Sequence, residues 1–237
     1  MLHSLFDAEP YDVIVVGTGF AGSLFLQRWL QRAPRTARAL VLERGARYTH
    51  AEQLARHPSW VTTDTSHGTY RVGEPAKEWK STHAFGGGSN CWYACTPRML
   101  PADFQTRTRF GVGVDWPVQY DELEPYYCDA EELLQVAGPP NDDSPFPRSR
   151  PYPLPPHRMN GVDRLFKQHF PGETFVQPCA RPTRPVRGRP ACCGNTVCGM
   201  CPVDAKFTVQ NALQAVYDDP RVTLRLESQV LAVDVEG

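Results

Sequence analysis

Val13-Ile-Val-Val-Gly-Thr-Gly-Phe-Ala-Gly22 is the stretch that decides the fold of this chain. Its four leading apolar residues predict a short buried strand, and a G-x-G-x-x-G turn follows them at once. Apolar residues then recur at helical spacing until Pro34 ends the helix. Leu40-Val-Leu42 predicts a second strand, which ends on Glu43 about twenty residues beyond the last glycine. This order of strand, glycine turn, helix, strand and acid predicts a parallel α/β fold that binds a dinucleotide.

Each part of this motif has a physical role. Gly17 allows the tight turn, Gly19 lets the backbone approach a pyrophosphate, and Gly22 allows the helix to pack closely on the strand. The positive end of the helix dipole faces the phosphates. Glu43 can accept hydrogen bonds from both ribose hydroxyls, which favours a 2′-hydroxyl over a 2′-phosphate. The alternative is a structural turn without ligand, but it leaves the acid and the three glycines unexplained together.

The composition excludes some classes of partner. The chain has 237 residues and a formal net charge of −1, so it offers no electrostatic argument for binding nucleic acid or anionic membrane. No apolar run approaches the ~20 residues of a membrane span. The first ten residues lack the basic and apolar regions of a secretory signal. We therefore expect a cytoplasmic location, with export alongside a signal-bearing partner, to the periplasm, as the alternative.

A second glycine-rich segment, Gly86-Gly-Gly-Ser-Asn90, lies downstream of the first motif. Consecutive glycines permit backbone conformations closed to other residues and a close approach to a flat ligand, and Ser89 and Asn90 add hydrogen-bond donors. Taken alone, such a segment is an ordinary loop. After a dinucleotide fold, it becomes a candidate loop for contacting a flavin.

The remaining sequence predicts a few further elements. Residues 46–84 are expected to be irregular, and Pro139–His157 is expected to be a proline-rich excursion over the surface. One helix is predicted to begin near Pro101, and three others are predicted to span Tyr120–Val136, Asn160–Phe170 and Thr208–Tyr217. Two further strands are predicted at Val222–Leu226 and Gln229–Val235.

The eight cysteines are unevenly spaced. Four of them fall within ten residues and are candidate metal ligands, namely Cys192, Cys193, Cys198 and Cys201. Thiolates suit iron–sulfur clusters because soft ligands match sulfide-bridged iron. A structural zinc site and reduced, merely packed thiols are the alternatives. The other four are expected to be small core residues, namely Cys91, Cys95, Cys128 and Cys179.

Four motifs together make the chain similar to the glucose–methanol–choline (GMC) family of FAD oxidoreductases. They are GTGFAGS with LERG near the N-terminus, FGGGSNCWYACTPRMLPADF, FGVGVDWPVQYDELEPYY and CPVDAKFTVQNAL. The resemblance covers nearly all of the chain and corresponds to the N-terminal part of the family. It implies an FAD-binding, Rossmann-like (doubly wound) α/β domain with irregular and helical insertions, and the C-terminal half of the family fold is absent. The implied divisions are a first FAD-binding part (1–115), a helical and proline-rich excursion towards the substrate domain (116–185), and the cysteine cluster with a return to the FAD-binding domain (186–237).

The resemblance also implies the cofactor site. FAD would be held by the first glycine turn and the end of the second strand, by the second glycine loop lying along the pyrophosphate and isoalloxazine, and by a valine backbone that contacts adenine. The matching residues are Gly17, Gly19, Phe20, Ala21, Gly22, Glu43, Arg44, Gly87, Gly88, Ser89, Asn90, Trp92 and Val230. Some relatives attach the flavin through a histidine of this loop, and Cys91 stands at that position here, so we expect non-covalent FAD.

The implied activity is oxidation of a CH–OH group of a sugar, polyol or alcohol, with a non-oxygen electron acceptor. The chain is most similar to the iron–sulfur-bearing sugar dehydrogenase branch, which implies a cluster on the four-cysteine segment, a cytochrome or quinone acceptor, and a small accessory subunit. The family's general base is expected beyond Gly237, so none of the seven histidines is assigned to this role. A catalytically silent, truncated fragment that binds a dinucleotide weakly or not at all is the alternative.

Overall fold

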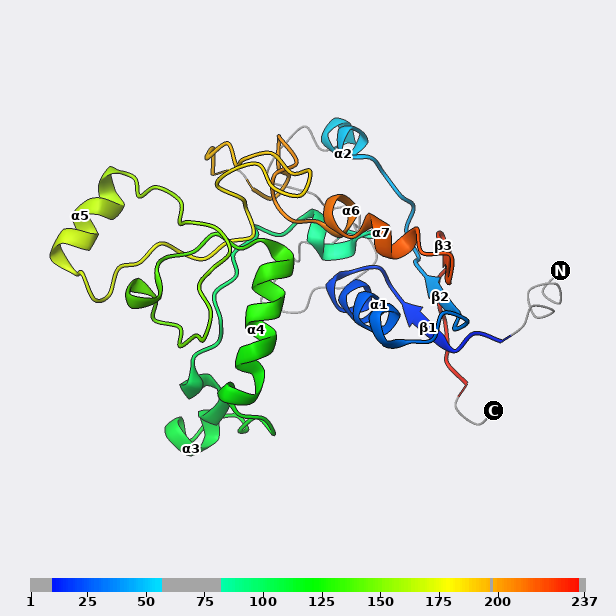
Figure 1. Cartoon of the computed structure of the whole chain (residues 1–237), viewed down its shortest axis with the longest axis horizontal. Helices are drawn as coiled ribbons and strands as arrows, with labels where there is room; N and C mark the ends of the chain where they lie inside the picture. Colours follow the sequence, from blue (N-terminus) through cyan, green and yellow to red (C-terminus); the bar gives the residue numbers. More distant parts are fainter. Residues whose placement is uncertain (1–9, 57–81, 197, 235–237) are drawn as a thin grey trace, which may run out of the picture. The chain divides into compact units, whose positions relative to one another are not determined.

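A computed structural model describes residues 10–56, 82–196 and 198–234 of the chain (Figure 1). The chain divides into two compact units. Unit 1 comprises Met1–Trp92, Thr196–Pro202 and Thr208–Gly237, and unit 2 comprises Tyr93–Asn195 and Val203–Phe207. The resemblance implies a different division into three parts, with boundaries after residues 115 and 185, and that division stays a prediction.

Unit 1 is built on a parallel three-stranded sheet of β1 (Val13–Val16), β2 (Ala39–Leu42) and β3 (Val222–Arg225). The strands lie in the order β1-β2-β3, with Val13 opposite Ala39 and Ala39 opposite Val222. The first two strands are those that the glycine motif predicts, and β3 matches the predicted strand at Val222. The α/β fold class is therefore confirmed.

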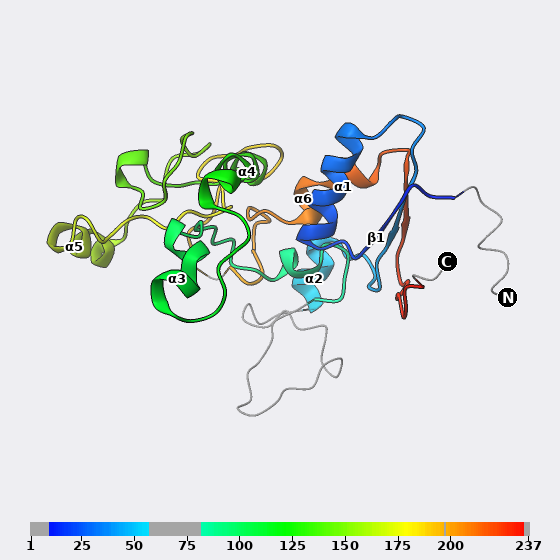
Figure 2. The same ribbon diagram turned by 90° about the horizontal axis from the view of Figure 1, so that it is seen from below.

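Helix α1 (Phe20–Arg32) covers one face of this sheet. Its Leu26 is fully buried, as are Ala39 and Val41 of the central strand, and Val15 of β1 is nearly so. Figure 2 shows α1 on the same side of the sheet as the short helix α6 (Val209–Ala212). Because alternate residues of a strand point to opposite faces, one face of β1 and β2 forms the core of the unit.

The opposite face of the sheet carries exposed apolar side chains. Ile14 is 58% exposed and Val16 is 59% exposed, although Val15 between them is buried. Among the described residues of unit 1, no helix lies on this face (Figure 2). Because the described helices cover only one face of the sheet, β1 is only half buried although all four of its residues are apolar.

Three sequence-based expectations for unit 1 need correction. Helix α2 (His50–Arg56) lies within the stretch 46–84 that was expected to be irregular, and residues 57–81 of that stretch lie outside the described part. The single helix expected over Thr208–Tyr217 is two short helices, α6 and α7 (Gln214–Tyr217), because Leu213 has φ −119° and ψ 19° and interrupts the helical backbone. No strand occupies residues 229–234. Leu231 and Val233 are 86% and 73% exposed there, so their alternation has no neighbouring strand to support it.

Unit 2 contains mostly helices and loops. Its longest helix is α4 (Tyr120–Leu134), which begins with a capping box between Gln119 and Glu122 and matches the predicted helix. The other described helices of unit 2 are η3 (Pro101–Gln105), α3 (Thr106–Phe110), η4 (Asn141–Asp143) and α5 (Gly161–His169). No helix in the described ranges of either unit is long and apolar enough to cross a membrane.

The proline-rich stretch Pro139–His157 is not simply a surface excursion, which corrects the expectation. Tyr152 and Leu154 are 8% and 2% exposed, and the Leu154 N–H donates to the Val136 carbonyl. The Tyr152 ring lies directly over Gly138, where an added Cβ would come within 2.4 Å of the ring. Proline prevents regular structure but not burial, so apolar residues between the prolines contribute to the core of unit 2.

A cluster of charged side chains is buried beside α4. Arg98 binds Glu131 in a bidentate pair with two N–O distances of 2.8 Å, and their side chains are 1% and 6% exposed. Arg148 donates to the same carboxylate at 2.5 Å, and Glu124 accepts from Arg98 at 3.1 Å. Two arginines and two glutamates thus balance their charges within the unit.

Breaking this cluster should destabilise unit 2. We expect Glu131→Gln to lower the free energy of unfolding by roughly 3–5 kcal/mol, because it leaves two buried guanidinium groups short of a counter-charge. Urea denaturation measures the change. Asp129→Asn is the matched control, since Asp129 pairs with Arg150 on the surface, where both side chains are about half exposed, and it should cost only ~0–1 kcal/mol. Equal losses from the two variants would contradict the assignment.

Stability should also depend on pH through Glu124. Burial raises the pKa of this carboxyl, but hydrogen bonds from Cys128, Ser149 and Arg98 outweigh burial and lower the pKa from its ordinary 4.5 to about 2. A lowered pKa contributes stability above the unfolded-state pKa, and the contribution is lost as pH falls through the folded-state pKa. We expect the free energy of unfolding to decrease between pH 4.5 and about 2, and Glu124→Gln to reduce that slope. Urea midpoints across this range test it, and identical slopes would refute it.

Candidate functional site

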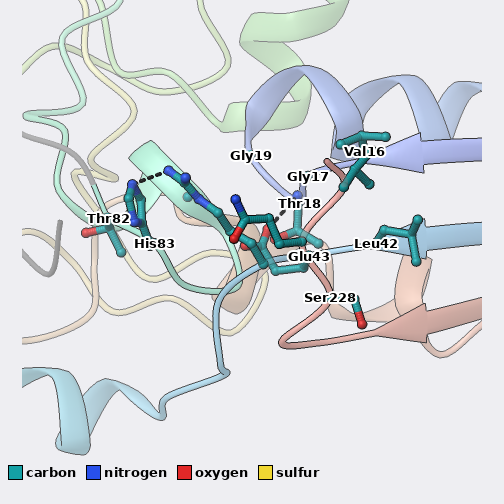
Figure 3. A pocket seen from close by; sticks show the side chains of 13 residues that line it. Val16, Gly17, Thr18, Gly19, Leu42, Glu43, Thr82, His83 and Ser228 are labelled. Carbon is teal, nitrogen blue, oxygen red and sulfur yellow. Dashed lines mark hydrogen bonds between the residues drawn. The ribbon is translucent and has the colours of Figure 1, made fainter. Parts of the chain in front are cut away.

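A cavity of about 300 Å³ lies in unit 1 at the carboxyl ends of β1 and β2 (Figure 3). Ligands of parallel α/β sheets bind at this edge, where the loops after the strands diverge. Its walls come from the glycine turn, the end of β2, the segment before the second glycine loop, and the chain after β3. They are Val16, Gly17, Thr18, Gly19, Leu42, Glu43, Arg44, Thr82, His83, Gly87, Ser228, Gln229 and Val230.

Thr18 and Glu43 join the glycine turn to the end of β2. The Thr18 N–H and hydroxyl both donate to Oε2 of Glu43, at 2.9 and 2.6 Å, and the Gly45 N–H donates to Oε1 at 2.8 Å. Thr18 is fully buried and Glu43 is 5% exposed. The acid at the end of β2 therefore already accepts three hydrogen bonds from its own chain.

Thr18 also reaches the second glycine segment. Its hydroxyl oxygen accepts from the Gly86 N–H at 2.9 Å. An added Cβ on Gly87 would come within 3.2 Å of Gly19 Cα, so the two glycine segments approach one another closely. Gly86 and Gly87 have φ of +93° and +49°, which glycine adopts without strain. These contacts hold two loops, 68 residues apart in sequence, on the same side of the cavity.

Gly19 leaves open space at the start of α1. It is the N-cap of this 13-residue helix, and a Cβ added to it would meet nothing within 4 Å. Gly22 differs, since its Cβ would lie 2.3 Å from the Gly17 carbonyl oxygen. Gly22 therefore serves packing, whereas Gly19 leaves room for a ligand beside the positive end of the helix dipole.

A buried hydroxyl pair supports the turn from below. The Ser23 hydroxyl donates to the Thr18 carbonyl at 2.8 Å and lies 2.6 Å from the Tyr217 hydroxyl. Burial raises the pKa of Tyr217 to about 12, so this phenol stays neutral at physiological pH. The hydrogen bond between Ser23 and Tyr217 therefore ties the glycine turn to α7 and adds no charge near the cavity.

A cationic and a heteroaromatic group also line the cavity. The Arg44 guanidinium and His83 Nε2 are hydrogen-bond partners, and Figure 3 shows His83 at the end away from Leu42. The wall formed by the chain after β3 is fixed by the backbone, because the Ser228 N–H donates to the Glu43 carbonyl at 2.8 Å. This bond places Val230 in the lining next to the end of β2.

The structure gathers some of the predicted site residues and not others. Six of them line the cavity, namely Gly17, Gly19, Glu43, Arg44, Gly87 and Val230. Phe20, Ala21 and Gly22 form the first turn of α1, and Trp92 packs edge-on against Phe20 with ring centroids 4.6 Å apart. Contact of these four residues with a ligand stays a prediction. The same holds for Gly88, where an added Cβ would meet no other atom within 4 Å.

The side chains of Ser89 and Asn90 form hydrogen bonds with backbone groups of unit 1. The Ser89 hydroxyl donates to the Gly86 carbonyl at 2.6 Å and accepts from the Val209 N–H at 3.0 Å. The Asn90 amide donates to the Phe85 carbonyl at 2.9 Å. Both residues are buried, their hydrogen bonds hold the loop in shape, and neither is among the residues that line the cavity. Their contact with a ligand stays a prediction.

Sequence reasoning missed five polar lining residues, Thr18, Thr82, His83, Ser228 and Gln229. Thr18 occupies the variable position between two motif glycines, and its hydroxyl was the available signal, because a buried turn needs polar partners. The other four lie in segments without regular structure. Only the fold brings them to the end of β2.

The four-cysteine segment does not form a metal centre here. Within the described residues, no group of three or more Cys, His, Asp or Glu side chains is placed to hold a metal ion. A cluster needs its thiolates to converge, and the predicted iron–sulfur site gains no support from the described residues.

No protein-family model matches the chain, but comparison with known proteins finds oxidoreductases as relatives. The chain is 30% identical over 227 residues to the fructose dehydrogenase large subunit of Gluconobacter japonicus, a match that covers 83% of this chain and 41% of that protein. It is 27% identical to the 2-methyl-1,2-propanediol dehydrogenase of Mycolicibacterium austroafricanum, over 68% of this chain and 31% of the relative.

The fold agrees with a solved structure. Pyridoxine 4-oxidase from Mesorbium loti superposes with a TM-score of 0.59 at 21% identity, over 96% of this chain and 44% of that one. The chain thus spans less than half the length of the relatives it matches. It belongs to the GMC oxidoreductase family and corresponds to the N-terminal, FAD-binding part of that family's fold.

Proposed function

We propose that this chain supplies the FAD-binding part of an oxidoreductase that acts on CH–OH groups of alcohol or sugar donors. The observation that carries the proposal is the cavity at the ends of β1 and β2, where two glycine segments meet beside a buried acid. The fructose and methylpropanediol dehydrogenases among its relatives support the donor class.

The residues of the cavity fit an adenine dinucleotide. The open position at Gly19 admits a diphosphate to the N-terminus of α1, because no N-cap side chain fills it. Glu43 and Val230 border the same space and suit the adenosine end. A carboxylate offers about four lone-pair sites, and three already accept bonds from Thr18 and Gly45. Glu43 therefore retains capacity to accept a further hydrogen bond from the ribose, and its contact with the two ribose hydroxyls stays a prediction.

Bound FAD supplies the acceptor for a hydride from the substrate carbon. The contribution of this chain is to bind and orient the dinucleotide through the glycine segments and the end of β2. We assign no general base within it, because His83, the histidine that lines the cavity, is the hydrogen-bond partner of Arg44.

The finer features of the proposal concern attachment and electron transfer. We propose non-covalent FAD, since the loop carries Cys91 where relatives that link the flavin carry histidine. We propose a non-oxygen acceptor and a companion subunit, because the first of the relatives described is a dehydrogenase large subunit. The iron–sulfur cluster is left out of this proposal, since no group of side chains among the described residues is placed to hold a metal ion.

Gly19→Ala should separate cofactor binding from folding. The residue has φ −68°, which alanine adopts readily, and its added methyl would meet no protein atom within 4 Å. The methyl would instead occupy the ligand space, so we expect at least a tenfold weaker FAD affinity, with a loss of unfolding free energy of no more than about 1 kcal/mol because alanine is a poorer N-cap than glycine. Titration of the purified chain with FAD, followed by flavin fluorescence, measures the affinity.

The control for this variant is Gly172→Ala, whose added Cβ also meets nothing within 4 Å and which lies in unit 2. It should bind FAD as the parent chain does. Failure of the parent chain to bind FAD, or equal affinity of the parent and Gly19→Ala, would refute the proposed site.

Glu43→Gln should weaken FAD binding by about 1.5–3 kcal/mol, the value of a hydrogen bond to a charged group. The amide group also disturbs the bonds from Thr18 and Gly45, so unfolding must be measured beside affinity. Glu173→Gln on the exposed surface is the control and should change neither quantity. A variant that keeps full affinity would show that the acid serves the fold alone.

A further inference from the structure

Two cysteines of unit 2 lie opposite each other in a short antiparallel arrangement. Cys179 pairs with Cys95 on one side and with Ala137 on the other. The Thr96 N–H donates to the Pro178 carbonyl at 2.9 Å, and the Ala180 N–H donates to the Ala94 carbonyl at 2.8 Å. These two bonds flank the cysteine pair, and neither cysteine uses its own N–H or carbonyl in them.

This pattern defines a non-hydrogen-bonded antiparallel pair. In such pairs the Cα atoms are ~4.5 Å apart and both side chains leave the same side of the backbone. A disulfide needs Cα atoms about 4.4–6.8 Å apart. The register therefore brings Cys95 and Cys179 within the range that a disulfide bridges, although 83 residues separate them in sequence.

The two thiols have different surroundings. Cys179 is 1% exposed, whereas Cys95 is exposed, which corrects the expectation that both are core residues. The described titratable groups that act on Cys179 are His157 and Arg181. The position of His157 is fixed, because its Nε2 lies 2.9 Å from the Arg181 carbonyl oxygen.

These neighbours favour the thiolate. Burial raises the pKa of Cys179, but the hydrogen bond with His157 and the charge of Arg181 outweigh burial and lower that pKa. Correspondingly, the bond with Cys179 raises the pKa of His157. A buried thiolate beside an imidazolium is the state in which a cysteine attacks another sulfur.

We propose that Cys95 and Cys179 form a redox-sensitive thiol pair, in which the exposed Cys95 reacts first and the buried Cys179 resolves it into an internal disulfide. The site is separate from the cavity of unit 1, and it does not depend on the proposed function. The oxidant that it would take is a low-molecular-weight disulfide.

The exchange balances in two steps. The Cys95 thiolate attacks one sulfur of the small disulfide, forms a mixed disulfide and releases one small thiolate. The Cys179 thiolate then attacks the Cys95 sulfur, which forms the protein disulfide and releases the second small thiolate. Two protein thiols are oxidised, one small disulfide is reduced to two thiols, and the two protons lost from the protein pass to those leaving thiolates.

Oxidised glutathione tests the proposal on the whole native chain. After incubation, the remaining thiols are alkylated and the digested protein is analysed by mass spectrometry. We expect a peptide pair linked through Cys95 and Cys179 that dithiothreitol separates. Persistent glutathione on Cys95 in the parent chain, or a link from Cys95 to another cysteine, would overturn the proposal.

Single substitutions assign the roles. Cys179→Ser should trap glutathione on Cys95 as a stable mixed disulfide, and Cys95→Ser should leave Cys179 reduced because the oxidant cannot reach it. Cys193→Ser is the matched control, since it removes a different exposed thiol and should leave the link intact. If Cys179→Ser does not fold, the outcome for Cys95→Ser still decides, because glutathione on Cys179 would contradict the order of reaction.

His157→Gln tests the positioning role of the imidazole. We expect the mixed disulfide on Cys95 to resolve at least tenfold more slowly at neutral pH and to recover as the pH approaches 9, the ordinary pKa of a thiol. A purely structural role for His157 would slow the step equally at every pH. A pH profile that matches the parent chain would show that the imidazole does not promote the thiolate.

Discussion

The buried contact between Thr18 and Glu43 is the interaction on which the geometry of unit 1 depends. One threonine hydroxyl donates to the acid at the end of β2 and accepts from Gly86 in the second glycine segment. Three segments far apart in sequence are thereby fixed at one edge of the sheet. Both side chains are buried, so an unmade bond would leave a polar group without water, and the arrangement is correspondingly specific. The cavity keeps its shape because its walls share these bonds.

Unit 2 achieves order by a different route. Its described strand pairing is limited to isolated bridges, so side-chain interactions replace a continuous sheet. The bidentate pair of Arg98 and Glu131 joins the segment after the second glycine loop to α4, and Arg148 brings in the proline-rich stretch. Charges buried in this way tolerate little rearrangement, since each needs its partner. The same scarcity of regular structure leaves Cys95 and Cys179 opposed in a bridge with one thiol exposed.

The sequence predicted the parts of the fold that local patterns determine. The order β1, glycine turn, α1, β2 and Glu43 is readable because each element is encoded by neighbouring residues. The break at Leu213 and the missing strand at 229–234 were not readable, since both depend on which segments lie alongside. The hydroxyl of Thr18 and the pair of Cys179 with His157 were missed for the same reason. Their partners lie 22 or more residues away, beyond any periodicity.

The hydrogen bonds of Glu43 change what the dinucleotide motif means in this chain. In the usual interpretation, the acid after the second strand is reserved for the ribose. Here three of its roughly four acceptor sites are used by Thr18 and Gly45, so the acid holds the turn as well as facing the cavity. Under the proposed function, shape then contributes to selection of the ligand beside the acid, through the space that Gly19 leaves open and the close approach of Gly87 to it. The glycines and the acid act together at this edge of the sheet, because the acid that faces the cavity also holds the turn to which Gly17 and Gly19 belong.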